Sequence, residues 1–323
     1  MSEKILCATD VATWFPVRGA LGGVVNHVKA VDGVSMHLLR GETYGLVGES
    51  GCGKSTLGRT LIRLLEPTSG QVTLFGEDIS HLKPKELLKY RRQVQIVFQD
   101  PYTSLNPRQR VGNMLIEAQT IHRIGQGRDE RMARAMDILG QVGLRREHFF
   151  RYPHEFSGGQ RQRIGLARAL ILDPQIVVCD EPVSALDVSI QSQIINLLRD
   201  LQQSRGLSYL FISHDMSVIK YISDRVGVMY LGHLVEEADT DELFDHPLHP
   251  YTRVLMSAVP DIHPGAEKQR IVLKGELPSP IDPPGGCVFH TRCPYATEEC
   301  ARCRPELREV SPGHRVACPC AAG

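Results

Sequence analysis

Residues 48–56 (GESGCGKST) carry the clearest chemistry in the sequence. They follow an apolar run at 44–47 and precede a helical pattern that continues to about Leu65. This strand–loop–helix context predicts a P-loop, in which backbone N–H groups and a helix N-terminus surround nucleotide phosphates. We expect Lys54 to reach the β and γ phosphates and Ser55 to bind Mg²⁺. The positions predicted to contact nucleotide are Gly48, Ser50, Gly51, Cys52, Gly53, Lys54, Ser55 and Thr56.

Two acidic residues and a histidine follow other apolar runs. Asp180 ends a run typical of a buried parallel strand, so we expect it to hold Mg²⁺ through water. Glu181 is the next residue, and a glutamate there suits a general base that orients or deprotonates water. His214 could bind the γ-phosphate and the attacking water, although a lone histidine is more often a structural residue than a catalytic one. The adjacent Asp215 could cap the next helix.

The elements that must position these residues can be read from the periodicity. Apolar runs predict strands at 71–75, 94–98, 176–179, 208–212 and 226–230. They alternate with helical patterns, which predicts an α/β fold with a largely parallel sheet. We expect residues 1–47 to form short strands joined by turns, and residues 106–150 to form helices.

The composition changes after about residue 245, where prolines recur. Because proline interrupts regular structure, we predict an extension that runs along the surface without long elements. The predicted division is therefore one domain over 1–245, with a helical subdomain at about 100–170, and an extension over 246–323.

The balance of charges limits the classes of partner. Lys and Arg together number 37, as do Asp and Glu, so no global field attracts nucleic acid. No run of about 18 apolar residues is present, and the polar start lacks the pattern of a secretion signal. We therefore expect any link to a membrane to pass through a partner.

Residues 156–163 (FSGGQRQR) are the most discriminating stretch in the chain. They resemble the signature motif of ATP-binding-cassette (ABC) proteins, with Phe156 where leucine is usual. A helical pattern to about Leu172 follows, so this helix start would expose N–H groups to a phosphate. The signature positions predicted to contact nucleotide are Ser157, Gly158, Gly159 and Gln160.

Other motifs of the ABC family then appear in order. Gln99 resembles the Q-loop glutamine, which touches Mg²⁺ or the lytic water and faces a membrane subunit. Residues 184–187 (SALD) resemble the D-loop and include Asp187, and His214 resembles the switch histidine. The resemblance implies a P-loop ABC nucleotide-binding domain with a mixed sheet core.

The resemblance also implies a mechanism that needs two subunits. Two ATP molecules lie between them, each bound by the P-loop of one subunit and the signature motif of the other. Binding closes the dimer and hydrolysis reopens it. An aromatic residue near the N-terminus should stack on adenine; Phe15 fits the spacing best, Trp14 is the alternative, and either could instead belong to the core.

Three further segments narrow the family. Residues 99–108 (QDPYTSLNPR), 246–252 (HPLHPYT) and 275–280 (GELPSP) resemble ATP-binding subunits of oligopeptide/dipeptide and related nickel importers. This resemblance implies a second ABC ATPase subunit, with which the chain would form a heterodimer. It also implies two transmembrane permease subunits, an external substrate-binding protein and a peripheral location at the cytoplasmic face of the inner membrane.

Six of the nine cysteines lie in the C-terminal tail. With no sign of secretion, metal binding is a better interpretation than disulfides. The tail resembles a segment that holds a [4Fe–4S] cluster in some members of the family. On that match Cys287, Cys293, Cys300 and Cys318 would be the ligands, although four thiolates also suit zinc. Partly buried free thiols are the alternative.

Two other functions compete with a transport ATPase. A soluble ABC ATPase acting on DNA or ribosomes would predict a coiled-coil insertion or two cassettes in one chain, and neither is found in the sequence. A metal-sensing regulator would use the cysteines as its sensor. The complete set of hydrolytic residues favours turnover, with ATP and Mg²⁺ as the ligands and no nucleic acid.

Overall fold

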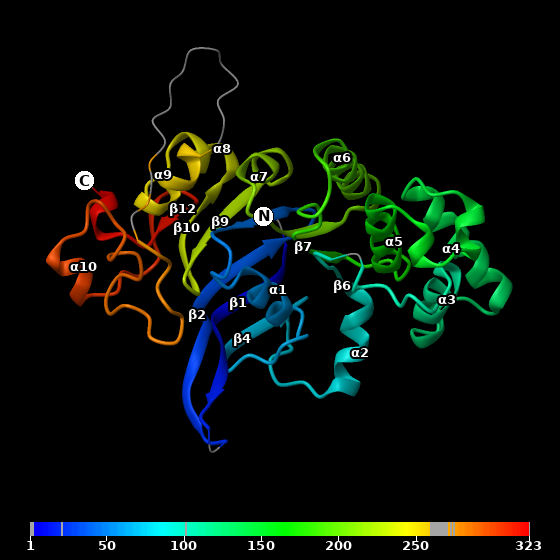
Figure 1. Ribbon diagram of the computed structural model, residues 1–323, viewed down its shortest axis with the longest axis horizontal. Helices are drawn as coiled ribbons and strands as arrows, with labels where there is room; N and C mark the ends of the chain where they lie inside the picture. The colour runs from blue at the N-terminus through cyan, green and yellow to red at the C-terminus, as the bar shows by residue number, and fades with distance from the viewer. Residues whose placement is uncertain are drawn as a thin grey trace, which may run out of the picture. The chain divides into compact units, whose positions relative to one another are not determined.

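The computed structural model describes residues 3–20, 22–100, 102–258, 271, 273 and 275–322. Pro101, in the segment after Gln99, and residues 259–270 of the proline-rich extension lie outside the described residues. The chain divides into two compact units (Figure 1): Met1–His81 with Ser213–Gly323 form unit 1, and Leu82–Ile212 form unit 2. The boundary predicted near residue 245 stays a prediction.

Unit 1 holds two sets of strands and short helices. Its elements are β1 (Lys4–Arg18), β2 (Val24–Leu39), β3 (Thr43–Val47), α1 (Lys54–Leu61), β4 (Ser69–Leu74), β5 (Glu77–Asp78), α7 (Met216–Ile222), β9 (Arg225–Tyr230), β10 (His233–Asp239), α8 (Thr240–Asp245), α9 (Pro250–Ser257), α10 (Glu298–Arg302), β11 (Arg308–Ser311), β12 (His314–Val316) and η3 (Pro319–Ala322). One sheet has the order β2-β1-β4-β5, and the other strands of the unit have the order β11-β12-β10-β9-β3.

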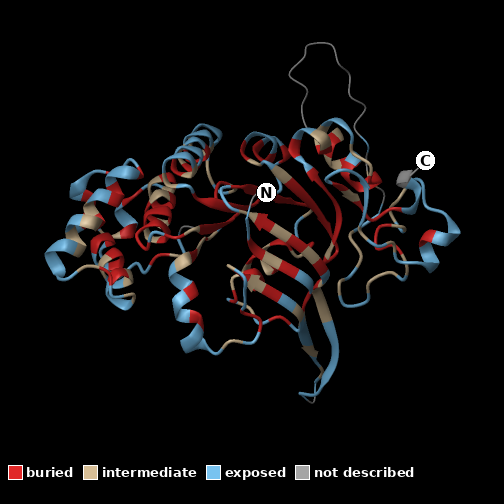
Figure 2. Cartoon of the chain, turned by 180° about the vertical axis from the view of Figure 1, so that it is seen from behind, coloured by how far each residue is buried: buried red, intermediate tan, exposed pale blue. Residues whose placement is uncertain are grey.

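The first two strands are much longer than the sequence analysis predicted. β1 and β2 span 15 and 16 residues and form an antiparallel hairpin. The partner of Thr13 is Val31 but that of Trp14 is Lys29, so Ala30 is an extra residue in β2. Such bulges bend a strand and break its alternation, which is why this hairpin reads as short strands. Its far end is exposed to solvent (Figure 2).

A buried charged network fixes the strand that leads into the P-loop. The Arg225 guanidinium on β9 binds Glu42 at 2.9 Å and Glu237 at 2.8 Å. The Tyr44 hydroxyl on β3 donates to the same Glu237 carboxylate at 2.8 Å. Because breaking a buried pair leaves an unpaired charge, this network holds β3, β9 and β10 in register.

The extension contributes to the sheet, which corrects the expectation that it only runs along the surface. β12 pairs with β10, placing Glu236 opposite Val316, and β11 pairs with β12. The buried imidazole of His314 contacts the Glu236 carboxylate at 2.8 Å and Glu242 at 3.1 Å. The short strand stays in place because its polar group is fully satisfied.

Unit 2 combines three parallel strands with the helices of the middle of the chain. Its elements are α2 (Pro84–Gln93), β6 (Val94–Val97), α3 (Val111–Ile121), α4 (Arg128–Gln141), η1 (Arg146–Phe150), η2 (Pro153–Glu155), α5 (Gly158–Leu170), β7 (Ile176–Asp180), α6 (Val188–Arg205) and β8 (Ser208–Ile212). The strands have the order β8-β7-β6, and every residue of β7 and β8 is buried, as apolar runs predict for inner parallel strands. With antiparallel pairs in unit 1 and parallel pairs here, the prediction of an α/β fold with mixed strands is confirmed.

Two helices end earlier than expected. α1 ends at Leu61 and not near Leu65, because Arg63 has a left-handed φ of 57°. Its buried side chain donates to the Ile79 carbonyl at 2.8 Å. α5 ends at Leu170, shortly before Asp173, whose φ is 51°. Among the described helices, none combines the length and apolar character needed to cross a bilayer.

Candidate nucleotide-binding site

The P-loop requires glycine at two positions, because at each the backbone of another strand approaches closely and φ is positive. A Cβ on Gly48 would lie 2.1 Å from the Met229 carbonyl oxygen, and one on Gly53 would lie 2.0 Å from that of Ala30. Their φ values of 151° and 104° are also in the region that side chains avoid. The loop therefore packs backbone to backbone against β9 and the bulge of β2.

Lys54 begins α1 and is held against the loop. Its ammonium donates to the Gly48 carbonyl at 2.7 Å and to the Glu49 carbonyl at 3.0 Å, with only 4% of the residue exposed. These bonds restrict a flexible side chain to the place where the loop N–H groups converge. Burial raises the pKa of the neighbouring Cys52 thiol, so that thiol is a packing group and not a nucleophile.

The other P-loop positions follow the surface of the unit. Ser50 and Gly51 are exposed at the loop tip, whereas Ser55 and Thr56 are half-buried in the first turn of α1. The hydroxyl of Ser55 thus lies one residue beyond Lys54 on the same helix start, where a P-loop serine meets Mg²⁺.

Glu49 has partners that the sequence analysis missed. Its backbone N–H donates to the Tyr251 hydroxyl at 2.7 Å, and its carboxylate binds the Arg292 guanidinium at 2.7 Å and 3.2 Å. Tyr251 belongs to the 246–252 segment, whose sequence resembles a family but predicts no contact with the P-loop. Arg292 precedes Cys293, and no local pattern in the sequence distinguishes it from other arginines.

The 246–252 segment is ordered by one buried carboxylate. Glu236 on β10 accepts hydrogen bonds from the backbone N–H groups of Leu248 and His249 at 2.7 Å and 3.0 Å. The His249 imidazole then accepts from the Tyr251 N–H at 3.1 Å and caps α9. Burial lowers the pKa of His249 to about 4, so the ring is neutral and can accept this bond.

His214 lies at the exposed end of the segment that leads into α7. The N–H of Ser213 donates to the Leu46 carbonyl at 3.2 Å, which places His214 beside the strand that precedes the P-loop. Asp215 caps α7 by accepting from the N–H groups of Ser217 and Val218, so the capping role considered for it is confirmed.

The two candidate aromatic residues for adenine differ in what surrounds them. The Trp14 indole donates to Asp32 at 3.2 Å, and the Lys29 ammonium lies 5.2 Å from its ring centre. Phe15, on the opposite face of β1, is 38% exposed. Thr13 shares that face and contacts Thr60 of α1 at 2.9 Å, so Phe15 faces the side of the P-loop helix.

The structure brings together the glutamine and the glutamate of unit 2. The Gln99 amide donates to the Glu181 carboxylate at 2.9 Å, and Asp180 before it ends β7 with 1% exposure. Glu181 has a left-handed φ of 47°, a conformation that costs a non-glycine residue about 1–3 kcal/mol. Such strain at a carboxylate is frequent where a side chain must be aimed at a substrate.

The signature residues form the start of α5. Ser157 caps the helix: its hydroxyl accepts from the Gln160 N–H at 3.4 Å, and the Gln160 side chain accepts from the Ser157 N–H at 3.1 Å. A Cβ on Gly159 would lie 2.5 Å from the Ile190 side chain of α6, so this position needs glycine for helix packing. Ser157 remains exposed and Gly158 half-buried, which leaves the helix start accessible.

Two further contacts in unit 2 were not expected. The Arg161 guanidinium lies 3.9 Å from the ring centre of Tyr102, and Arg168 donates to the Ser104 carbonyl. The segment after Gln99 is thereby fixed to the signature helix. Asp187 begins α6 and is exposed, with no side-chain cap bond.

The tail cysteines are free thiols that influence one another. Burial is the main cause that raises the pKa of Cys287, Cys293 and Cys318, and the charges of neighbouring cysteines add to it, so that the pKa of Cys318 is about 11. A hydrogen bond with the Thr297 hydroxyl lowers the pKa of Cys300. Among the described residues no three His, Cys, Asp or Glu are close enough to hold a metal ion. The tail thiols nevertheless lie close enough to shift one another's pKa values, and Cys300 hydrogen-bonds with Cys320.

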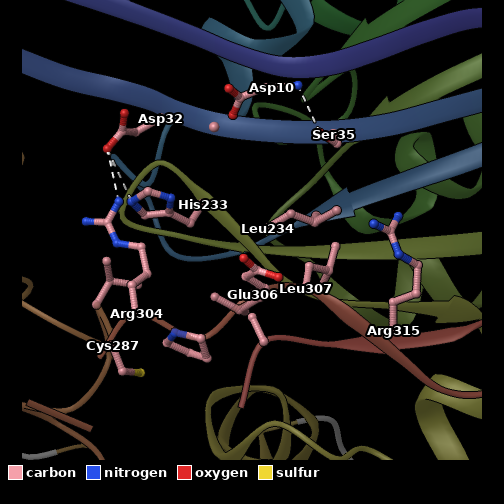
Figure 3. A pocket seen from close by; sticks show the side chains of 15 residues that line it. Asp10, Asp32, Ser35, His233, Leu234, Cys287, Arg304, Glu306, Leu307 and Arg315 are labelled. Carbon is pink, nitrogen blue, oxygen red and sulfur yellow. Dashed lines mark hydrogen bonds and ion pairs between the residues drawn. The ribbon is translucent and has the colours of Figure 1, made fainter. Parts of the chain in front are cut away.

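A separate cavity of about 590 Å³ lies between β2, β10 and the extension in unit 1 (Figure 3). Its walls carry Asp10, Asp32, His233, Arg304 and Arg315. Arg304 binds Asp32 at 3.3 Å, and His233 approaches the same carboxylate at 3.7 Å. No P-loop residue lines this cavity, so it is distinct from the phosphate-binding surface.

Comparison with known proteins identifies the family. The ABC transporter family model matches residues 31–184, and the model for the oligopeptide/dipeptide transporter C-terminal region matches residues 235–300. The chain is 55% identical over 320 residues to the oligopeptide transport ATP-binding protein AppF of Bacillus subtilis, covering 98% of this chain and 97% of AppF. The chain belongs to the ATP-binding proteins of the oligopeptide/dipeptide ABC transporters. Its likeness to this family, predicted from the three segments at 99–108, 246–252 and 275–280, is therefore confirmed.

Other relatives and solved structures agree with this family. The dipeptide transport ATP-binding protein DppF of Escherichia coli is 48% identical over 318 residues, which cover 98% of this chain and 95% of DppF. A dimeric post-hydrolysis structure of the ATP-binding cassette MJ0796, bound to ADP and phosphate, matches 73% of this chain and 99% of its own with a TM-score of 0.66 and 27% identity. As a member of the ABC ATPase family, the chain is an ATP hydrolase coupled to transport, for which ATP and Mg²⁺ are the typical ligands.

Proposed function

We propose that this chain is the ATP-hydrolysing subunit of an importer of di- or oligopeptides. The observation that carries the proposal is the Gln99–Glu181 pair at the end of β7, in a chain that also has a complete P-loop and signature helix. The relatives AppF and DppF are oligopeptide and dipeptide transport ATP-binding proteins, and the peptide class of the cargo follows from that likeness.

In the proposed reaction, the oxygen of a water molecule bonds to the γ-phosphorus of ATP while the bond from that phosphorus to the β–γ bridging oxygen breaks, so that ADP and phosphate leave. Glu181 accepts a proton from this water or orients the water for attack. The Gln99 amide holds the Glu181 carboxylate through the hydrogen bond described above. Lys54 stabilises the charge on the β and γ phosphates, and His214 binds the γ-phosphate. Ser55, Gln99 and Asp180 would hold Mg²⁺, which supplies neutralisation of the phosphate charge.

The signature helix is proposed to serve the ATP of a partner subunit. Ser157, Gly158, Gly159 and Gln160 start an accessible helix, and Asp187 is exposed beside them in the chain's next helix start. We infer a heterodimer with a second ABC ATPase subunit, bound to two transmembrane permease subunits that receive cargo from an external substrate-binding protein. The chain would then lie peripherally on the cytoplasmic face of the inner membrane.

The experiment is uptake of a labelled tripeptide by cells in which this chain is replaced by Lys54→Ala. We expect uptake and ATPase activity of the purified complex to fall at least about 100-fold, because one phosphate-stabilising charge is lost. Lys85→Ala, which removes an exposed lysine of α2, is the matched control. If Lys54→Ala hydrolyses ATP at the wild-type rate, the P-loop assignment is wrong. If it loses hydrolysis while the cells take up the tripeptide as before, the proposal that the cargo is a peptide is wrong.

We also propose two domains, 1–245 and 246–323, of which the second holds a [4Fe–4S] cluster on Cys287, Cys293, Cys300 and Cys318. Cys287, Cys293, Cys300 and Cys318 are free thiols, and four thiolates are the donor set that such a cluster uses. Since no three potential ligands among the described residues lie close enough to hold an ion, binding of the cluster would have to draw these thiols together. The cluster would be structural.

Anaerobic purification should give a brown protein with equal amounts of iron and sulfide, and Cys303→Ser should retain both. Stoichiometric zinc, or no metal, refutes the cluster.

A further inference from the structure

Glu49 stands at the centre of the contacts between the P-loop and the extension. Its carbonyl oxygen accepts from the Lys54 ammonium at 3.0 Å. Its N–H donates to the Tyr251 hydroxyl, and its carboxylate binds Arg292. The residue that holds the phosphate-binding lysine is therefore itself held by two residues from the extension.

The Arg292–Glu49 pair has the geometry of a strong interaction. Two guanidinium nitrogens reach the two carboxylate oxygens, at 2.7 Å and 3.2 Å. The Arg292 side chain is 8% exposed and that of Glu49 is 30% exposed. Such a two-point charged contact fixes orientation as well as distance, and its partial burial reduces screening by salt.

The extension side of this contact is rigidly packed. The rings of Tyr230, Tyr251 and Phe289 are fully buried and meet with centroids 4.8–5.5 Å apart. A hydrogen bond from the Arg292 N–H to the Phe289 carbonyl, at 3.0 Å, closes the turn that presents the guanidinium. Neither anchor can move without disturbing this cluster.

We propose that Arg292 is a positioning residue for nucleotide binding, which acts through Glu49 on Lys54, with Tyr251 as its second anchor. This inference rests on the proposed function of the P-loop. Removing Arg292 frees the Glu49 side chain, so the loop and the lysine lose a fixed arrangement and must be ordered by the nucleotide itself. The cost falls on binding, because the groups that transfer the phosphoryl group remain.

The experiment measures the affinity of the purified full-length chain for a fluorescent ATP analogue with Mg²⁺. In Arg292→Gln we expect the Kd to rise about tenfold, or about 1.4 kcal/mol, because the charge-assisted two-point contact with Glu49 is lost. The KM for ATP should rise by a similar factor, with kcat changed less than about threefold. Arg292→Lys, which keeps the charge without the two-point contact, should lie between these values.

A double-mutant cycle tests whether Arg292 acts through Glu49. Glu49→Gln alone should weaken binding as much as Arg292→Gln, and the double variant should be no weaker than either. Arg304→Gln is the matched control, because it removes an ion pair of the same extension, with Asp32, that contacts no P-loop residue (Figure 3). Its Kd should stay within about twofold of the wild type.

The alternatives give different results. Wild-type affinity in folded Arg292→Gln, additive effects in the cycle, or equal weakening by Arg304→Gln each overturn the coupling. Absence of binding by the wild-type chain contradicts the proposed function instead. If Arg292→Gln does not fold, Tyr251→Phe removes only the hydroxyl that accepts the Glu49 N–H; an about threefold rise in Kd supports the coupling and an unchanged Kd overturns it.

Discussion

The P-loop and the signature helix both start a helix that exposes N–H groups, yet they are supported in opposite ways. The P-loop is surrounded by its own chain: Lys54 is 4% exposed and bound to loop carbonyls, and Glu49 is held from the extension. The signature helix depends on a local capping box at Ser157, which is exposed. The P-loop is thus supported by distant parts of its own chain, whereas the start of the signature helix is left accessible, where we propose that the ATP of a partner subunit binds.

Because of this difference, we expect the two motifs to tolerate different substitutions. At the P-loop, segments of unit 1 that are distant in sequence meet. A substitution in the extension should therefore alter the binding of the nucleotide phosphates. At the signature helix, the proposed function depends on the accessible N–H groups at the helix start. Substitutions there should act mainly by disturbing the packing of this helix against α6. The four predictions below separate these cases, from the largest expected effect to the smallest.

Glu181→Gln should cause the largest loss, because it removes the proposed base while keeping the hydrogen bond with Gln99. We expect ATP hydrolysis to fall about 10²–10⁴-fold, the usual contribution of general base catalysis. ATP binding should be retained, and size-exclusion chromatography with ATP should show an accumulated dimer. Asp173→Asn, at an exposed site of unit 2, is the control. Hydrolysis at the wild-type rate in Glu181→Gln rules out the base assignment.

The stability of the 246–252 segment, which carries the P-loop contact Tyr251, should fall in acid because of His249. Burial lowers the pKa of its imidazole from 6.5 to about 4, so its contribution to stability is present above about pH 6.5 and is lost as the pH falls towards 4. Between pH 7 and pH 5 this amounts to about 2 kcal/mol.

His249→Asn keeps a side-chain oxygen for the α9 cap and cannot titrate. Urea unfolding at a series of pH values should therefore show a smaller slope for the variant than for the wild type. His37 and His233, whose pKa values are also lowered to about 4, are present in both proteins and cancel in the difference. Equal slopes would exclude His249 as a source of acid sensitivity.

Gly159→Ala tests the packing behind the signature helix. The new methyl group would meet Ile190 at 2.5 Å, so we expect a loss of stability of about 1.5 kcal/mol, as is typical of overpacking. Adding Ile190→Ala should restore most of it. Gly165→Ala, where no atom lies within 4 Å of the added Cβ, is the control and should not destabilise the helix. Failure of Ile190→Ala to rescue would point to a cause other than this contact.

Phe15 should contribute least among these residues. Loss of one stacked ring should weaken ATP binding by about 1 kcal/mol, or about fivefold, in Phe15→Ala. Binding of inorganic tripolyphosphate, which lacks adenine, should be unchanged. Trp14→Ala removes the other candidate ring together with its bond to Asp32, and this variant should bind ATP normally. The reverse pattern would assign the adenine contact to Trp14.

The sequence predicted the parts of the fold that depend on local patterns. The buried strands β7 and β8 appear at 176–179 and 208–212 because an apolar run with β-branched residues leaves little choice. The long β1–β2 hairpin was missed because its bulges shift the alternation. The early end of α1 at Leu61 was missed because a buried hydrogen bond of Arg63 overrides helix propensity.

The site shows the same division between local and distant causes. The P-loop glycines, the helix start at Ser157 and the strand end at Asp180 follow from spacing along the chain. The contacts of Glu49 with Tyr251 and Arg292 do not, because these two residues lie 202 and 243 positions further along the chain. Only the folded sheet brings those segments to the P-loop.

The hold of Arg292 on Glu49 has a consequence for the extension. If the extension favours the loop conformation that accepts ATP, then by thermodynamic reciprocity ATP must favour the folded extension by the same free energy. The nucleotide would then slow hydrogen–deuterium exchange at the amides around Phe289 and Arg292, far along the chain from the residues it touches. The C-terminal segment would thereby report, in its own opening and closing, whether ATP is bound.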